Sequence, residues 1–157
     1  MIYSIEEIGQ ECQKWKKESK NIVFTNGCFD LLHKGHIDLL KKSLGFGDIL
    51  IVGLNSDRSI KRLKGSSRPI ENKRTRVRKL LKLNIISGLC IFDNETPLEL
   101  IKVIKPDVLV KGGDYEPNKI IGSSEVIKEG GMIKIVPLLP GYSTTRSIEK
   151  MRREGLV

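Results

Sequence analysis

The chain of 157 residues is long enough to form one domain with a buried core. Hydrophobic residues make up 39% and charged residues 30%, which excludes a wholly disordered chain. No apolar run approaches the ~18 residues of a membrane span, and the first residues lack the apolar core of a signal peptide. Cys12, Cys28 and Cys90 show no C-x-x-C spacing, which predicts reduced thiols in a cytoplasmic protein.

The net charge of +9 is concentrated in one segment. From Arg58 to Lys82 there are eleven Lys or Arg residues against one acid, Glu71, so the rest of the chain is close to neutral. Such a segment indicates an anionic partner, while a solvated helix face is the alternative. Aromatic residues are only 5% of the chain and none lies within the basic run, which argues against a nucleic-acid-binding surface.

The predicted elements of the first half begin with an amphipathic helix. Ser4 and Glu7 have capping-box spacing, and apolar residues recur every three to four positions until about Lys20. A short buried strand, a helix and a nearly continuous apolar strand are predicted next, at residues 22–24, 35–44 and 48–54.

In the second half, strands continue to alternate with helices over short connections. Helices are predicted at residues 72–83, 96–104 and 123–129 and from about 143, and strands at 85–92, 107–110 and 132–136. This alternation predicts an α/β fold with a Rossmann-like open sheet of about five parallel strands and helices on both faces. We expect one domain over residues 1–157, with an N-terminal helix in 1–20 and a core in 22–151.

Both histidines of the chain, His33 and His36, lie at one predicted turn between the first long strand and the next helix. In open α/β folds ligands bind at the carboxyl ends of strands, and a helix N-terminus offers free N–H groups to phosphate. Gly35 would let a ligand approach the backbone. Two surface histidines are the alternative, but the presence of both at this turn favours a phosphate site.

Two motifs carry a resemblance to a known family. Residues Val23 to His36 resemble the signature of the nucleotidyltransferase superfamily marked by H-x-G-H, in its cytidylyltransferase-like branch. Gly141 to Arg146 resembles the second motif of that family, a G-x-S-T-T helix start. The family has a HUP-type fold, and both motifs hold the triphosphate of a nucleotide. Their order and their separation of over a hundred residues make the signal specific, whereas the second motif alone would be only a helix cap.

Further stretches resemble one subfamily, the D-glycero-β-D-manno-heptose 1-phosphate adenylyltransferases, in its stand-alone form. These stretches are Asn55–Asp57, Lys61–Gly65, Ser67–Pro69, Thr96–Pro97, Pro106–Tyr115, Ile121–Ser123 and Gly130–Gly131. The resemblance implies transfer of AMP from ATP to a sugar 1-phosphate, with release of pyrophosphate, for lipopolysaccharide or other heptose-containing glycans. It also implies Mg²⁺ carried by the phosphates, no nucleic-acid or membrane partner, and a homodimer.

The sequence departs from family patterns at two places. Arg74 stands where the family commonly has Glu, two residues before Arg76. The stretch Leu138–Gly141 lacks the Arg that precedes S-T-T in glycerol-3-phosphate cytidylyltransferases, which counts against glycerol phosphate as acceptor. The alternatives are another member of the superfamily, such as a glycerol-3-phosphate or ethanolamine-phosphate cytidylyltransferase or an FAD synthetase, and then a nucleic-acid-binding module.

The resemblance implies roles for individual residues. Five are predicted to be catalytic, namely His33, His36, Lys61, Lys64 and Arg76, with the histidines donating to the α- and β-phosphates and Arg76 holding the β- or γ-phosphate. Nucleotide or phosphate contacts are predicted for Thr25, Asn26, Gly27, Phe29, Gly35, Asn55, Lys111, Gly112, Asp114, Ser143, Thr144 and Thr145. Sugar-phosphate contacts are predicted for Cys28, Asp30 and Arg68.

Overall fold

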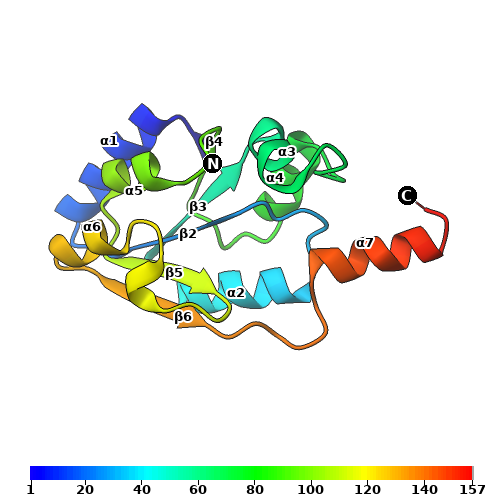
Figure 1. Ribbon diagram of the computed structural model, residues 1–157. Helices are drawn as coiled ribbons and strands as arrows, with labels where there is room; N and C mark the ends of the chain where they lie inside the picture. Colours follow the sequence, from blue (N-terminus) through cyan, green and yellow to red (C-terminus); the bar gives the residue numbers. More distant parts are fainter. Residues whose placement is uncertain (157) are drawn as a thin grey trace.

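Alternating apolar strands and amphipathic helices form a six-stranded parallel sheet in the computed structural model, which describes residues 1–156 (Figure 1). The sheet order is β1-β4-β3-β2-β5-β6, and every pair of neighbours is parallel. The strands are β1 (Ile2–Tyr3), β2 (Ile22–Gly27), β3 (Ile49–Asn55), β4 (Gly88–Phe92), β5 (Val108–Gly112) and β6 (Met132–Val136). The predicted α/β class is confirmed, but the predicted number of strands is one too low. The two-residue edge strand β1 is too short for a recognisable alternation of side chains.

The helices follow the predicted order, with ends shifted by a few residues. They are α1 (Ile5–Lys17), α2 (Lys34–Leu44), α3 (Asp57–Lys64), α4 (Lys73–Leu81), α5 (Leu98–Ile104), the 3-10 turn η1 (Pro117–Lys119), α6 (Ser123–Lys128) and α7 (Thr144–Arg153). Ser4 caps α1 in a complete capping box with Glu7, as its spacing predicted. No helix in residues 1–156 combines the length and the apolar character that crossing a membrane requires.

The core lies in two layers, one on each face of the sheet. Along β3, every residue is buried and successive side chains enter opposite layers. Ile51 packs with residues of α1, α5 and α6, while Leu50 and Val52 pack with residues of α2 and α4. Figure 1 shows α1, α5 and α6 over one face and α2 over the other. Coverage of both faces explains why the central strands are apolar without interruption.

The direction in which the chain adds strands reverses at β2. From β2 the chain passes through α2 to β3 and then β4 on one side, and α5 returns it to β5 and β6 on the other. Strand β2 pairs with β3 over six residues, but with β5 only at Val23 and Phe24. The ends of β2 and β5 therefore diverge, which creates the crevice where open α/β sheets bind ligands.

Part of the basic segment is paired with carboxylates of the protein itself, two of the pairs around buried guanidinium groups and three at the surface. Five of its eleven cations form ion pairs, Arg58 and Arg62 with Asp93, Arg68 with Asp30, Arg76 with Asp57, and Lys79 with Glu71. These pairs fasten α3, α4 and the loop between them to the strand ends. Fewer of these cations are therefore available to bind an external anion than the sequence suggested.

Candidate active site

The two histidines cap the start of α2 together. The Nδ1 atom of His33 accepts hydrogen bonds from the N–H groups of Gly35 and His36, at 3.0 and 3.3 Å. In return, His36 Nδ1 accepts from the N–H group of His33 at 3.2 Å, and the ring centroids are 3.7 Å apart. A ring nitrogen that accepts a hydrogen bond carries no proton, so each neutral imidazole is protonated on Nε2. This cap therefore leaves two Nε2–H donors for a ligand.

Both imidazoles are uncharged at neutral pH. Burial, together with the charges of His33 and Lys64, lowers the pKa of His36 to about 3, against a smaller opposing effect of Asp30. Burial also lowers the pKa of His33. A group with a pKa near 3 is a weak base at pH 7. The pair is therefore built to donate hydrogen bonds to an anion and not to remove protons.

We expect His36 to stay neutral down to about pH 4 and the titration midpoint of His33 to lie below 6.5. A lowered pKa means that the folded protein binds fewer protons than the unfolded chain below pH 6.5, so the pair reduces stability as pH falls from 6.5 towards 3. Imidazole ¹⁵N shifts measured across this range would test this, since the chain has only these two histidines. A midpoint at or above 6.5 for either ring would contradict the prediction.

The start of α7 lies beside the start of α2 (Figure 1). Ser143 caps α7 by accepting from the N–H group of Arg146, at 3.0 Å. The hydroxyl of Thr144 donates to the carbonyl oxygen of Asp30, at 2.9 Å, in the loop that leads to α2. The two sequence motifs are thus joined, and two helix N-termini with their partial positive charges converge on one region.

Gly35 makes this close approach possible. A Cβ atom at this position would lie 3.2 Å from Cβ of Tyr142 and 2.8 Å from Cε1 of His33. The rings of His33 and Tyr142 stack with their centroids 6.3 Å apart. A side chain at position 35 would therefore separate the helix starts or displace the histidine. Thr145, the last residue of the second motif, is exposed.

Asp30 supports the loop before α2, and this geometry favours a structural role over its predicted contact with the sugar phosphate. One carboxylate oxygen accepts from Nε of Arg68 at 3.1 Å and from the Ile70 N–H at 2.8 Å, and the other accepts from the Glu71 N–H at 2.9 Å. The side chain of Asp30 is fully buried and that of Arg68 is only 12% exposed. Nε of Arg68 is engaged in this ion pair, while its Nη2 is buried without a hydrogen-bond partner among the described residues, so its predicted sugar-phosphate contact stays a prediction.

Arg76 is likewise enclosed by protein, which favours a structural role over its predicted role in holding the β- or γ-phosphate. Its side chain is 0% exposed. The guanidinium donates to the carbonyl oxygens of Glu71, Cys28 and Asn55 at 3.1, 2.9 and 2.8 Å, and to the carboxylate of Asp57 at 2.6 Å. Arg76 therefore joins the ends of β2 and β3 to the starts of α3 and α4.

Two predicted nucleotide contacts are also buried. Thr25 is 1% exposed, and its hydroxyl donates to the carbonyl oxygen of Val110 at 3.0 Å, across the gap between β2 and β5. Phe29 is 4% exposed, and its ring packs edge-on against His36, with centroids 5.4 Å apart. Both side chains therefore support the site from within, and the predicted nucleotide contacts of these residues stay predictions that would have to use their backbone groups.

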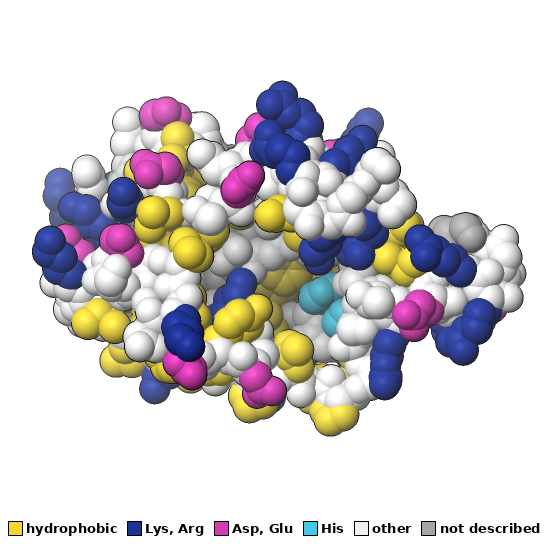
Figure 2. All heavy atoms as spheres, viewed as in Figure 1, with side chains coloured by type: hydrophobic (Ala, Val, Ile, Leu, Met, Phe, Trp, Pro, Cys, Tyr) yellow, Lys and Arg dark blue, Asp and Glu magenta, His cyan; other side chains and the backbone are white. Residues whose placement is uncertain are grey.

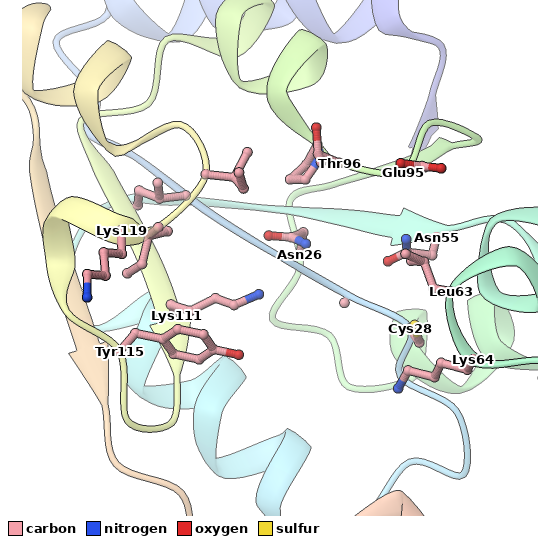
Figure 3. Close-up of a pocket in the computed structure, with 15 residues that line it drawn as sticks. Asn26, Cys28, Asn55, Leu63, Lys64, Glu95, Thr96, Lys111, Tyr115 and Lys119 are labelled. Atoms are coloured by element: carbon pink, nitrogen blue, oxygen red, sulfur yellow. The ribbon is translucent and has the colours of Figure 1, made fainter.

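A cavity of about 440 Å³ opens where β2, β3 and β5 end (Figure 3). Its walls include the predicted residues Asn26, Gly27, Cys28, Asn55, Lys64 and Lys111. The sequence prediction missed Leu63, Glu95, Thr96, Pro97, Leu109, Tyr115, Lys119, Ile120 and Ile121. Figure 3 shows the amino groups of Lys64 and Lys111 approaching the cavity from opposite sides. Tyr115 could have been predicted from the sequence, because it directly follows the Lys111–Asp114 stretch that was expected to contact the nucleotide.

Besides the residues already described, three further predicted residues lie outside this wall. Among the described residues, Lys61 and Asp114 are exposed and do not line the cavity, and Gly112 is half-buried at the end of β5. Of the two lysines predicted to reach the phosphates, the structure thus places Lys64, and not Lys61, in the cavity wall.

Lys64 connects the histidine pair with the cavity. Its ammonium group lowers the pKa of His36, of the Cys28 thiol and of Lys111, so all three lie within its electrostatic reach. For Cys28, burial has the larger effect and raises the pKa. Figure 2 shows the histidine side chains exposed on the wall of a hollow in this face of the molecule. The imidazole donors, the helix starts and the cavity lysines therefore form one continuous site.

Comparisons with known proteins agree with this description. A family described as cytidylyltransferase-like matches residues 24–150. The bifunctional protein HldE of Koribacter versatilis (strain Ellin345) is 53% identical over 137 residues, which are 87% of this chain and 28% of that protein. HldE of Rhodopseudomonas palustris (strain BisB5) is 47% identical over 97% of this chain and 31% of its own length. The chain thus spans about 30% of the length of these curated relatives.

Two solved structures share the fold. The lipopolysaccharide core biosynthesis protein from Thermoplasma volcanium GSS1 is 29% identical with a TM-score of 0.60, covering 76% of this chain and 97% of that one. Pantoate-β-alanine ligase from Francisella tularensis, complexed with β-γ ATP and β-alanine, is 15% identical with a TM-score of 0.63, covering 99% and 83%, and shows the fold alone.

The parallel sheet and the paired helix starts define a Rossmann-like α/β protein with a site at the carboxyl ends of its strands. The chain belongs to the cytidylyltransferase-like family, as the H-x-G-H motif predicted.

Proposed function

We propose that the protein transfers AMP from ATP to a sugar 1-phosphate, D-glycero-β-D-manno-heptose 1-phosphate, and so forms ADP-heptose. The observation that carries the proposal is the convergence of two helix N-termini and two neutral imidazole donors beside a cavity with two lysines. The choice of acceptor rests on the motifs that resemble heptose 1-phosphate adenylyltransferases and on the HldE relatives. By the same resemblance, we propose a cytoplasmic homodimer.

In this reaction an oxygen of the acceptor phosphate attacks the α-phosphorus of ATP. A new phosphorus–oxygen bond forms, the bond between the α-phosphorus and the bridging oxygen breaks, and pyrophosphate leaves with the electron pair. The attacking oxygen is already deprotonated at neutral pH, so no protein base is needed. The requirement is to hold two anions in line and to stabilise the charge that develops on the bridging oxygen.

The residues of the site fit this requirement. The starts of α2 and α7 would hold the triphosphate, with His33 and His36 donating from Nε2 to its oxygens. Lys64 lies between this region and the cavity, where it would neutralise the phosphates that react. Neutral donors serve here without any change of protonation during the reaction.

Mg²⁺ would reach the site as part of the ATP substrate. No cluster of three or more His, Cys, Asp or Glu side chains suited to a metal is found in residues 1–156, and both carboxylate oxygens of Asp30 already accept hydrogen bonds. The starts of α2 and α7 and the cavity lysines supply N–H and ammonium donors, which bind phosphate oxygens and not cations, and Glu95 is the one carboxylate among the described cavity residues. The ion would therefore be held by the phosphates and water.

A screen of substrate pairs tests the proposal. Pyrophosphate release is measured with ATP or CTP and, in turn, heptose 1-phosphate, glycerol 3-phosphate, phosphoethanolamine and FMN. We expect turnover with ATP and heptose 1-phosphate. Absence of pyrophosphate with this pair, together with turnover of another pair, would assign the protein to a different activity within the superfamily.

A further inference from the structure

Lys111 is a half-buried cation without an ion-pair partner. It lies on β5 and lines the cavity, and its Nζ is 5.5 Å from the ring centroid of Tyr115. None of the ion pairs within residues 1–156 includes it. Burial lowers its pKa, and the charge of Lys64 lowers it further against an opposing effect of Cys28. A partly desolvated ammonium group of this kind is costly unless an anion joins it.

The position of Lys64 defines where that anion would lie. The two amino groups approach the same space from the end of α3 and from β5 (Figure 3). They repel one another, as the effect of Lys64 on the pKa of Lys111 shows. The carboxylate in the cavity wall, that of Glu95, belongs to an exposed residue and is not among the charges that affect Lys111. An anion between the two lysines would relieve both the repulsion and the desolvation.

The triphosphate of the nucleotide has its own binding groups elsewhere. The starts of α2 and α7 supply them, and His33, His36 and Ser143 are not part of the cavity wall. The cavity itself combines the lysines with an apolar side formed by Pro97, Leu109 and Ile120. Its volume of about 440 Å³ is within the range of small-molecule sites. These features suit a phosphate attached to a small organic molecule.

We infer that Lys111, opposite Lys64, holds the phosphate of the acceptor and makes the enzyme select phosphorylated acceptors. The inference rests on the proposed function and changes the sequence prediction, which placed Lys111 with the nucleotide. Lys64 lies near His36 and would touch both substrates, whereas Lys111 lies on the far side of the cavity and would touch only the acceptor.

The test compares Lys111→Met with Lys134→Met. Lys134 is a matched control because it lies on the neighbouring strand β6, with its Nζ 5.7 Å from the ring of Phe46 and outside the cavity wall. Calorimetry gives the Kd of the magnesium complex of a non-hydrolysable ATP analogue, and then that of heptose 1-phosphate in its presence. For Lys111→Met we expect the acceptor Kd and KM to rise at least about tenfold. We expect the analogue Kd to change less than about threefold, and Lys134→Met to change neither constant by more than that.

A raised Kd for the ATP analogue with an unchanged Kd for the acceptor would place Lys111 in the nucleotide site and overturn the inference. No change in either Kd would also overturn it. Lys111→Arg keeps the charge and is expected to bind the acceptor more tightly than Lys111→Met. If thermal melting shows that the Met variant is unfolded, Lys111→Arg becomes the test variant. A loss of affinity for the ATP analogue alone in Lys111→Arg would then overturn the inference. If the substrate screen identifies another phosphorylated acceptor, the proposed function fails, and the same titrations with that acceptor decide the role of Lys111.

Discussion

Replacing His36 with Asn is expected to lower kcat by about a hundredfold or more while the protein stays folded. The amide oxygen of Asn can take the place of Nδ1 and accept from the N–H group of His33, so the cap of α2 is kept. The shorter side chain has no donor where Nε2–H lies. Loss of one donor to the developing charge costs about 2.7–4 kcal/mol of transition-state stabilisation, which corresponds to this fall in kcat.

The complementary variant His36→Gln separates the two functions of the ring. The Gln amide places an N–H donor near the position of Nε2 but loses the Nδ1 acceptor, so we expect it to retain more activity and less stability than the Asn variant. Lys41→Ala, at an exposed position on the same helix, serves as the control and should keep wild-type kcat. Steady-state kinetics and thermal unfolding give both quantities. Wild-type kcat in the Asn variant would remove His36 from the mechanism.

The local motifs were predictable because their geometry is set over a few residues. The capping spacing of Ser4 and Glu7 fixed the start of α1, and the stretch from His33 to His36 fixed the start of α2. The meeting of this helix with α7 followed from a resemblance to a family and not from the residues alone. Periodicity cannot show that Thr144 reaches the loop at Asp30, more than a hundred residues away in the chain.

The charged residues were harder to interpret, because partners distant in sequence decide whether a charge faces a ligand or the interior. Asp30 accepts from backbone groups about 40 residues further on, and Arg76 donates to the carbonyl groups of Cys28, just after β2, and of Asn55, the last residue of β3. The ligand roles predicted for both residues came from the resemblance to the family and not from a pattern in the residues themselves. Only the packing of the loop between α3 and α4 against the strand ends shows that they are enclosed.

The missed cavity residues have a related cause. Thr96 and Tyr115 belong to loops that follow β4 and β5, and a loop's path depends on the elements that it joins. Their sequences contain turn-forming residues but no periodic pattern. Most of the side of the cavity that β2 and β3 build was therefore predicted from the sequence, whereas Lys111 was the one wall residue predicted on the opposite side.

Replacing Arg76 with Met is expected to lower the free energy of unfolding by about 3–5 kcal/mol, because it breaks a buried ion pair and leaves the other charge without its partner. Three carbonyl oxygens, those of Cys28, Asn55 and Glu71, would lose their guanidinium donor, and Asp57 would lose its ion-pair partner. Urea unfolding of the ligand-free protein measures the change. Arg78→Met, at an exposed position of the same helix, is the control and should stay within about 0.5 kcal/mol of wild type.

The ligand-free measurement separates the enclosed Arg76 from a phosphate-binding one. A guanidinium kept for the β- or γ-phosphate would be unpaired before ATP arrives, so its removal would leave the ligand-free stability unchanged or raise it, and would raise the KM for ATP. Removing an enclosed guanidinium has the opposite effect, because it lowers the free energy of unfolding of the ligand-free protein. The KM for ATP would then change only indirectly, through a shift of the backbone at Cys28 and Asn55. Asp57→Asn provides the intermediate case, since the amide keeps an oxygen for Arg76 but no charge, and should lose less stability than Arg76→Met.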